Sequence, residues 1–187
     1  GHLAAARAAA AALGLDRLVF VPAGIPPHKA LPEGSPGEGQ RLEMTSILAD
    51  QLLRPELTLV WDAELARPGK SYTSDTLRQA ARRWPGEELW LLMGSDMFRS
   101  LHTWHEPEVI LSLAGVCAFT RSRAEGEDSL SVQQDQLHRR YGARVVTMGI
   151  PGLVEVSSTQ LRQLLGRGEG RQFLPEAVYG YILREKL

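Results

Sequence analysis

The sequence contains a single cysteine, almost no net charge and no long apolar run. Because Cys117 has no partner cysteine in the chain, an internal disulfide is excluded, and a reducing cytoplasm is the expected location. The formal net charge of −1 provides no basic field, so we expect no nucleic-acid partner. The apolar runs are shorter than a bilayer span, so we expect no membrane partner either.

The alanine-rich start does not read as a signal peptide, because it lacks a basic leader and Arg7 interrupts it. The sequence does not begin with methionine, so either residues were removed or the sequence starts partway through the protein. Its 187 residues, 43% hydrophobic and 23% charged, fit one globular domain over 1–187 with a sizeable core. Cys117 lies in the apolar run 115–119, which predicts a buried core residue.

Strands and helices alternate along the chain. Short apolar segments predict strands at 18–21, 57–61, 89–93, 116–120 and 144–148. Helical spacing and strong helix formers predict helices at 3–13, across 44–52, across 73–84, at 106–113, at 130–140, around 161–165 and from near Pro175 onward. This alternation indicates parallel strands joined by right-handed crossovers. We therefore expect an α/β fold, a doubly wound parallel sheet with helices on both faces.

Local signals refine some of these boundaries. Gly14 is the expected C-terminal cap of the first helix, and Thr73 or Ser74 the expected N-cap of the third. The strand at 18–21 is apolar throughout, which is typical of burial on both faces. The stretch 30–39 is rich in proline and glycine and predicts a surface loop.

In sheets of this class, ligands bind beyond the carboxyl ends of the strands. Gly94-Ser95-Asp96 follows the third strand, where glycine permits close approach and the acid accepts hydrogen bonds from a sugar hydroxyl. Trp104 lies just downstream and offers a face for stacking on a planar ring. Each has a plainer interpretation: ordinary turn chemistry for 94–96, and a half-buried packing residue for Trp104.

Two further segments follow strands. In the segment Pro22–Lys29, the two prolines Pro26 and Pro27 stiffen a loop directly before His28 and Lys29, an arrangement suited to an anion or carboxylate. Arg121 directly follows the fourth strand, where a phosphate could arrive. An exposed turn and a surface arginine are the alternatives. His102 and His105 are three residues apart, but no other ligand is spaced to complete a site, so we expect no metal held by the protein.

The strongest local pattern is Val156-Ser157-Ser158-Thr159-Gln160-Leu161-Arg162. Three hydroxyl residues open a helix and an arginine follows one turn later. Free backbone N–H groups and the helix dipole favour an anion there, and Arg162 adds planar charged donors. The pattern predicts a triphosphate site, with simple serine N-capping as the alternative. Gly1-His2 similarly precedes the first helix, where a histidine can hydrogen-bond a phosphate.

Together these segments resemble the bacterial nicotinate-nucleotide adenylyltransferases, members of the nucleotidyltransferase superfamily. The similarity runs in order along nearly the whole chain, through 1–3, 20–29, 40–44, 67–77, 94–96, 103–105 and 156–162. The most specific segment is 71–77, Ser-Tyr-Thr-Ser-Asp-Thr-Leu, which is similar to the family's Ser-Tyr-Thr-x-Asp-Thr-Leu. Gly-Ser-Asp stands for the family's Gly-Ala-Asp, and Val156 for an isoleucine.

The resemblance implies a Rossmann-like fold and also shows a departure. The family's first strand, its glycine-rich turn and the first histidine of His-x-Gly-His have no counterpart in the sequence. We therefore expect a chain truncated at its N-terminus, with its first strand missing and little activity by itself.

The resemblance further implies in-line transfer of the adenylyl group from ATP to nicotinate mononucleotide, with Mg²⁺ held mainly through substrate phosphates. It assigns His2 and Arg162 as catalytic residues. The ATP-binding residues would be Gly1, His2, Gly94, Asp96, Ser157, Ser158, Thr159 and Arg162. The residues binding nicotinate mononucleotide would be Pro27, His28, Lys29, Thr73, Trp104, His105 and Arg121.

Two other functions remain open at this point. Another superfamily transferase, such as pantetheine-phosphate adenylyltransferase, would share the phosphate motif but not 71–77 or the Trp104 segment. A catalytically silent nucleotide-binding module is the alternative from a different class. The sequence leaves the oligomeric state open, a homo-oligomer included.

Overall fold

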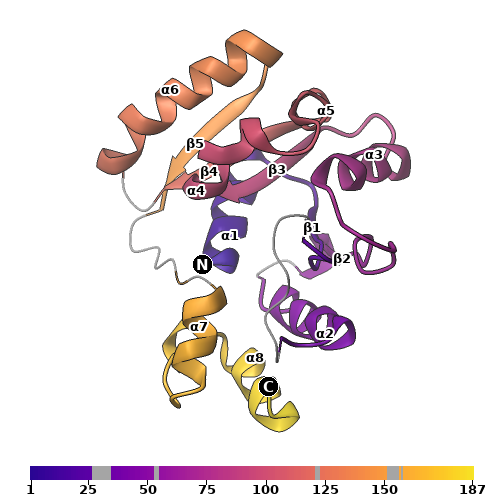
Figure 1. Ribbon diagram of the computed structural model, residues 1–187, viewed down its shortest axis with the longest axis vertical. Coiled ribbons are helices and arrows are strands. Elements are labelled where there is room, and N and C mark those ends of the chain that lie inside the picture. The colour runs from indigo at the N-terminus through magenta and orange to yellow at the C-terminus, as the bar shows by residue number, and fades with distance from the viewer. Residues whose placement is uncertain (27–34, 53–54, 121–122, 151–155, 157) are drawn as a thin grey trace. The chain divides into compact units, whose positions relative to one another are not determined.

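The structure is a computed structural model that describes residues 1–26, 35–52, 55–120, 123–150, 156 and 158–187 (Figure 1). Its contacts divide the chain into two compact units. Unit 1 comprises Gly1–Ser71 and Val154–Leu187, and unit 2 comprises Tyr72–Leu153. The expectation of one domain over 1–187 stays a prediction.

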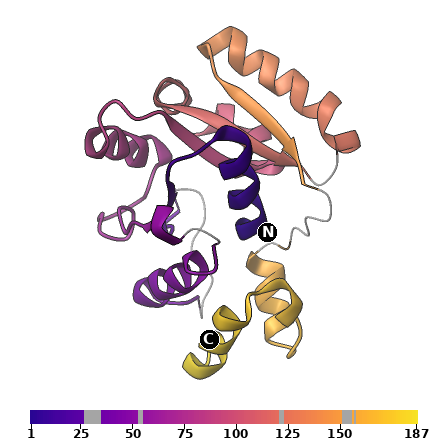
Figure 2. The same cartoon turned by 180° about the vertical axis from the view of Figure 1, so that it is seen from behind.

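Unit 1 begins with α1 (His2–Leu13), drawn in indigo with the N-terminus at its end in Figure 2. Its alanine-rich sequence favours a helix, and Gly14 ends it in the left-handed conformation at φ 62, as predicted. Strands β1 (Leu18–Phe20) and β2 (Thr58–Val60) pair in parallel, with Leu18 opposite Thr58. Between them in the chain lies α2 (Glu38–Ala49), and the short 3₁₀ helix η1 (Pro55–Leu57) leads into β2.

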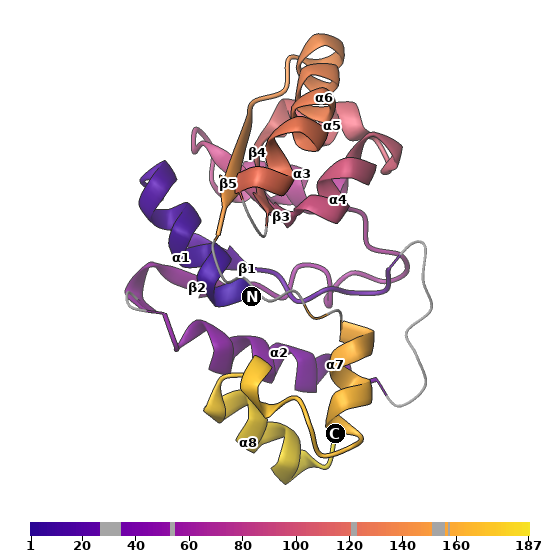
Figure 3. The ribbon, with the colours of Figure 1, turned by 90° about the vertical axis from the view of Figure 1, so that its left-hand side faces the viewer.

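The C-terminal part of unit 1 is helical. It contains α7 (Ser158–Leu165), the 3₁₀ turn η3 (Arg171–Phe173) and α8 (Glu176–Glu185). Val178, Tyr181 and Ile182 form the buried face of α8, and α8 packs against α2 (Figure 3). Pro175, near which a helix was predicted to begin, is the N-cap of α8.

Unit 2 contains a parallel sheet in the order β3-β4-β5, made of β3 (Leu89–Gly94), β4 (Ala114–Thr120) and β5 (Val145–Gly149). All seven residues of the central strand β4 are buried, including Cys117, as predicted. The helices of the unit are α3 (Thr73–Arg83), α4 (Ser95–Ser100), α5 (Pro107–Leu113) and α6 (Arg123–Tyr141), with η2 (Leu101–Thr103) after α4.

The core of unit 2 forms where α4, α5 and α6 pack on the sheet. Helix α6 lies along β5 (Figure 1), and α5 contacts both β4 and α3. Phe98, Leu101, Ile110 and Leu130 are completely buried, and Trp104 packs against this cluster from its edge. This core therefore fixes the loops at the carboxyl end of β3 and before α5.

The parallel α/β arrangement is confirmed, but several boundaries differ from the prediction. Within the described residues, hydrogen bonds divide the strands into the pair β1-β2 and the sheet β3-β4-β5. Strand β1 stops at Phe20, and its residues are half-buried rather than buried on both faces. Helix α2 begins at Glu38, inside the predicted loop, because the Gln40 side chain accepts a hydrogen bond from Gly37 N–H at 2.8 Å.

Two further expectations were wrong. Leu52 lies beyond α2, because the chain turns after Ala49 with Leu52 N–H bonded to the Ala49 carbonyl. Thr73 is the first residue of α3 rather than its cap. The N-cap is Tyr72, in extended conformation and without a side-chain capping bond. Among the described residues, no helix is long and apolar enough to cross a membrane.

Candidate active site

The start of α3 presents hydrogen-bond donors within unit 2. Thr73 opens the helix after Tyr72, and the first intrahelical bond of this turn runs from Thr76 N–H to the Tyr72 carbonyl at 3.2 Å. The amides of Thr73 and Ser74 precede that bond, in the first turn of the helix. This helix end can therefore receive a carboxylate or phosphate.

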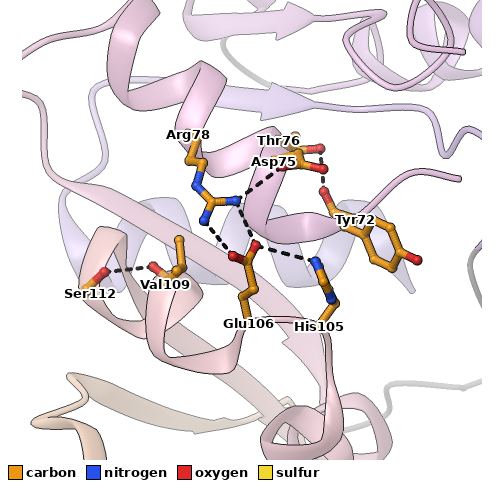
Figure 4. A network of polar contacts seen from close by, with 8 residues as sticks. All are labelled: Tyr72, Asp75, Thr76, Arg78, His105, Glu106, Val109 and Ser112. Atoms are coloured by element: carbon orange, nitrogen blue, oxygen red, sulfur yellow. Dashed lines mark hydrogen bonds and ion pairs between the residues drawn. The ribbon is translucent and has the colours of Figure 1, made fainter.

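The loop before α5 lies beside this helix start (Figure 4). The rings of Tyr72 and His105 are 4.2 Å apart between centroids, tilted by 38°. Trp104 is half-buried, and its indole N–H donates to the Ser100 hydroxyl at 3.3 Å. Three predicted mononucleotide residues, Thr73, Trp104 and His105, thus come from two segments that the structure brings together.

An arginine–glutamate pair joins the same two segments. Arg78, on α3, donates to both carboxylate oxygens of Glu106 at 2.7 and 2.8 Å, and to Asp75 at 3.2 Å (Figure 4). The hydrogen bonds from Arg78 are the main cause that lowers the pKa of Glu106 to about 2. The same pairing raises the pKa of Arg78 further above its ordinary value. Both side chains are therefore charged throughout the neutral range.

At the carboxyl end of β3, the predicted residues occupy a strand-to-helix turn. Gly94 ends the strand and is the N-cap of α4, and Asp96 lies in the first turn of that helix. The Asp96 carboxylate is exposed and accepts a hydrogen bond from Arg99 at 3.1 Å. An exposed carboxylate at this position is able to accept hydrogen bonds from ligand hydroxyls.

In unit 1, the predicted phosphate residues lie at two helix starts. Gly1 is the N-cap of α1 and His2 its first residue. The His2 side chain is exposed at this helix start, and a histidine ring N–H is able to donate to a phosphate. Ser158 and Thr159 open α7, although their side chains lie outside the description, and Arg162 follows within the helix, half-buried.

Five predicted residues are not described by the structure. They are Pro27, His28 and Lys29 from the proline-rich loop, Arg121 after β4, and Ser157 before α7. The structure does describe the segment that leads to Pro27. Gly24 N–H donates to the Glu64 carboxylate at 3.2 Å, and Ser71 N–H bonds the Ile25 carbonyl at 2.9 Å. The loop entry is thus attached to the chain just before α3.

Arg78 and Glu106 were not predicted from the sequence as residues of the site. The two ends of the ion pair are 28 residues apart, a separation for which no local spacing rule exists. The available signals were weak: an acid directly after Trp104-His105, and an arginine just over one turn into the helix that follows Tyr72.

Residues 1–164 match the family described as cytidylyltransferase-like. A Thermus thermophilus protein named "Probable nicotinate-nucleotide adenylyltransferase" is 38% identical, with 100% of this chain and 91% of the relative aligned. A Lachnoclostridium phytofermentans protein of the same name is 32% identical, covering 98% of this chain and 89% of the relative. This chain belongs to the nicotinate-nucleotide adenylyltransferase family.

A solved structure agrees with the fold of this family. The Plasmodium falciparum nicotinic acid mononucleotide adenylyltransferase, complexed with NaAD, aligns with a TM-score of 0.71 over 92% of this chain and 82% of its own. Its sequence identity is 17%, so the likeness concerns the fold alone. The Rossmann-like nucleotidyltransferase fold expected from the sequence is therefore confirmed, and family membership makes the chain a nucleotidyltransferase enzyme.

Proposed function

We propose that this protein transfers the adenylyl group of ATP to nicotinate mononucleotide, giving nicotinate adenine dinucleotide and pyrophosphate in NAD biosynthesis. The observation that carries the proposal is the alignment, nearly end to end, with relatives that bear this activity in their names, at 32% and 38% identity. The cytoplasm, where ATP is available, is the proposed location.

The reaction needs positioning more than side-chain nucleophiles. A phosphate oxygen of the mononucleotide attacks the α-phosphorus of ATP. The new P–O bond forms as the bond to the β-phosphate oxygen breaks, and pyrophosphate carries away that electron pair. Aligning the two substrates and neutralising charge on the phosphate oxygens supplies the catalysis.

For nicotinate mononucleotide, we assign the start of α3 and the loop before α5. The first-turn amides at Thr73 would receive the ring carboxylate, since a helix N-terminus favours an anion. Trp104 would stack on the pyridine ring with His105 beside it. The contact between the Tyr72 and His105 rings and the Arg78–Glu106 pair support this assignment by holding the two segments together. The resemblance also implies Pro27, His28, Lys29 and Arg121 for the mononucleotide, with Lys29 or Arg121 contacting its phosphate.

For ATP, we propose the residues that the family resemblance implies, each in its own role. His2 would donate its N–H to the phosphates beside Gly1. Ser157, Ser158 and Thr159 would bind the triphosphate, and Arg162 would stabilise the charge that develops on the leaving pyrophosphate. Gly94 would allow close approach, and the exposed Asp96 would accept hydrogen bonds from ribose hydroxyls.

Mg²⁺ would enter as part of the ATP substrate. Among the described residues, no three histidine, cysteine, aspartate or glutamate side chains gather to hold a metal ion. An ion coordinated by substrate phosphates and water fits this set of residues, because Mg²⁺ usually retains several waters. The Mg²⁺ ion would neutralise negative charge on the phosphate oxygens.

A pyrophosphate-release assay tests the function. The full-length protein is mixed with MgATP and, separately, nicotinate mononucleotide, nicotinamide mononucleotide or phosphopantetheine. We expect the fastest release with nicotinate mononucleotide. Faster release with phosphopantetheine would indicate the related transferase. Calorimetric binding of ATP without release from any acceptor would indicate a silent nucleotide-binding module.

A further inference from the structure

Glu106 is fixed through its side chain by Arg78. Two parallel hydrogen bonds of 2.7 and 2.8 Å join the guanidinium to the carboxylate, and Asp75 accepts a third at 3.2 Å (Figure 4). A paired contact of this kind sets orientation as well as distance, since both groups are planar. The carboxylate therefore has a defined place beside the first turns of α3.

Glu106 is also fixed through its backbone. It adopts the left-handed conformation, with φ 51 and ψ 58, which is uncommon for a residue other than glycine. Its carbonyl accepts hydrogen bonds from the amides of Val109 and Ile110 at 3.0 and 3.2 Å, which begins α5. Such a conformation persists where surrounding contacts over-determine it, and it often occurs at functional sites.

The residues immediately before Glu106 are those assigned to the nicotinate ring. His105 stacks against Tyr72, and its Nε2 lies 3.5 Å from the Glu106 carboxylate. Trp104 packs on the core cluster and is bonded to Ser100. A shift of Glu106 would therefore move His105 and Trp104 relative to the amides at the start of α3.

We infer that Glu106, held by Arg78, is a positioning residue that sets the distance between the carboxylate-binding start of α3 and the ring-binding Trp104-His105 segment. The inference rests on the proposed function. Recognition of nicotinate needs both segments at once, because the carboxylate is attached directly to the ring. The pair thereby contributes to affinity for the mononucleotide and not to affinity for ATP.

The chemistry of the pair favours positioning over catalysis. The guanidinium donors of Arg78 already bond Glu106 and Asp75. The pKa of Glu106 is about 2, so the carboxylate carries no proton to donate near neutral pH and is a weak base there. A charge that stays constant suits a fixed link between two segments.

The test compares two identical exchanges in the full-length enzyme. Glu106→Gln keeps the shape of the side chain but removes its charge. Glu176→Gln makes the same change in the exposed Arg171–Glu176 pair, whose hydrogen bonds measure 2.9 to 3.2 Å. We expect Glu106→Gln to raise the KM for nicotinate mononucleotide roughly tenfold, because small misplacements of binding groups have effects of this order. The KM for ATP and the kcat at saturation should stay near wild type, and Glu176→Gln should change none of these.

A second variant separates pairing from general damage. Arg78→Gln should reproduce the KM effect, and Arg78→Gln/Glu106→Gln should be no worse than either single change, because both remove one interaction. If Glu106→Gln proves too unstable to assay, Arg78→Lys retains the charge but loses the paired geometry, and the same rise in KM is expected.

Two results would overturn the inference in different ways. The first applies if the wild-type enzyme is active. If Glu106→Gln then leaves the KM for nicotinate mononucleotide unchanged, or raises the KM for ATP by the same factor, the positioning role alone is refuted. A wild type that releases no pyrophosphate from ATP and nicotinate mononucleotide would refute the proposed function and this inference with it.

Discussion

Gly24 lies where the proline-rich loop leaves β1, and the structure leaves no room there for a side chain. A methyl group on its Cα would lie 2.4 Å from the Ser71 hydroxyl oxygen and 2.6 Å from the Glu64 carbonyl oxygen. Both distances are far inside van der Waals contact. The serine hydroxyl is able to rotate away, although it bonds the same carbonyl at 3.3 Å. The carbonyl belongs to the backbone, so relief requires moving the chain.

We expect Gly24→Ala to destabilise the protein by about 1–3 kcal/mol, the cost of forcing an extra methyl group into a packed position. An alanine also reduces the freedom of the unfolded chain, which offsets about 0.4–1 kcal/mol of that cost. For a chain of this size each kcal/mol corresponds to about 2–4 °C in the melting temperature, so we expect a fall of several degrees. The loop entry would shift too, raising the KM for nicotinate mononucleotide.

Thermal and urea unfolding measure the effect, with Gly180→Ala as the matched control. Gly180 lies in α8, exposed, and a methyl group there meets nothing within 4 Å. An alanine inside a helix should stabilise by about 0.5–1 kcal/mol. Adding Ser71→Ala to Gly24→Ala should restore only part of the loss, because the Glu64 carbonyl remains. A Gly24→Ala protein as stable as wild type would refute the steric argument.

Three further predictions concern the proposed site. Arg162→Ala should lower kcat roughly tenfold to a thousandfold in steady-state assays, as for a lost transition-state donor, and wild-type turnover would contradict its role. Trp104→Ala should raise the KM for nicotinate mononucleotide far more than that for ATP, whereas equal changes would exclude stacking. The folded pKa of Glu106 is about 2 against an ordinary 4.5, so its ion pair stabilises the fold fully above pH 4.5 and loses that contribution as pH falls toward 2. The melting-temperature gap between wild type and Glu106→Gln should therefore narrow below pH 4.5, and a constant gap down to pH 3 would contradict this.

The regular elements followed closely from the sequence because their signals are local. The alanine run and Gly14 specify α1 and its end, and the strand predicted at 116–120 is present, extended back to Ala114 and buried along its whole length. Boundaries failed where a neighbouring contact decided them. Gln40 extends α2 backward by bonding Gly37, and the extended Tyr72 takes the cap position expected for Thr73.

The residues of the proposed site also differ in how far the sequence indicates them. The family resemblance implies Thr73, Trp104 and His105 as mononucleotide residues, and the contact between the Tyr72 and His105 rings joins the two segments of unit 2 that carry them. Nothing local joins Arg78 to Glu106, because pairing across 28 residues depends on how α3 meets the loop before α5. A left-handed glutamate is likewise invisible in a sequence, since its conformation comes from packing rather than from propensity.

The identity of residue 106 is itself an argument for the pair. A glycine would adopt φ 51 without strain, and asparagine tolerates that region better than most residues. Backbone geometry alone therefore does not explain a glutamate. Pro107 is equally able to begin α5 after a glycine, an asparagine or a glutamate at position 106. A carboxylate, however, accepts two hydrogen bonds from the Arg78 guanidinium, which glycine and asparagine do not. The ion pair therefore accounts for a glutamate in this strained conformation, and together they hold the loop against α3.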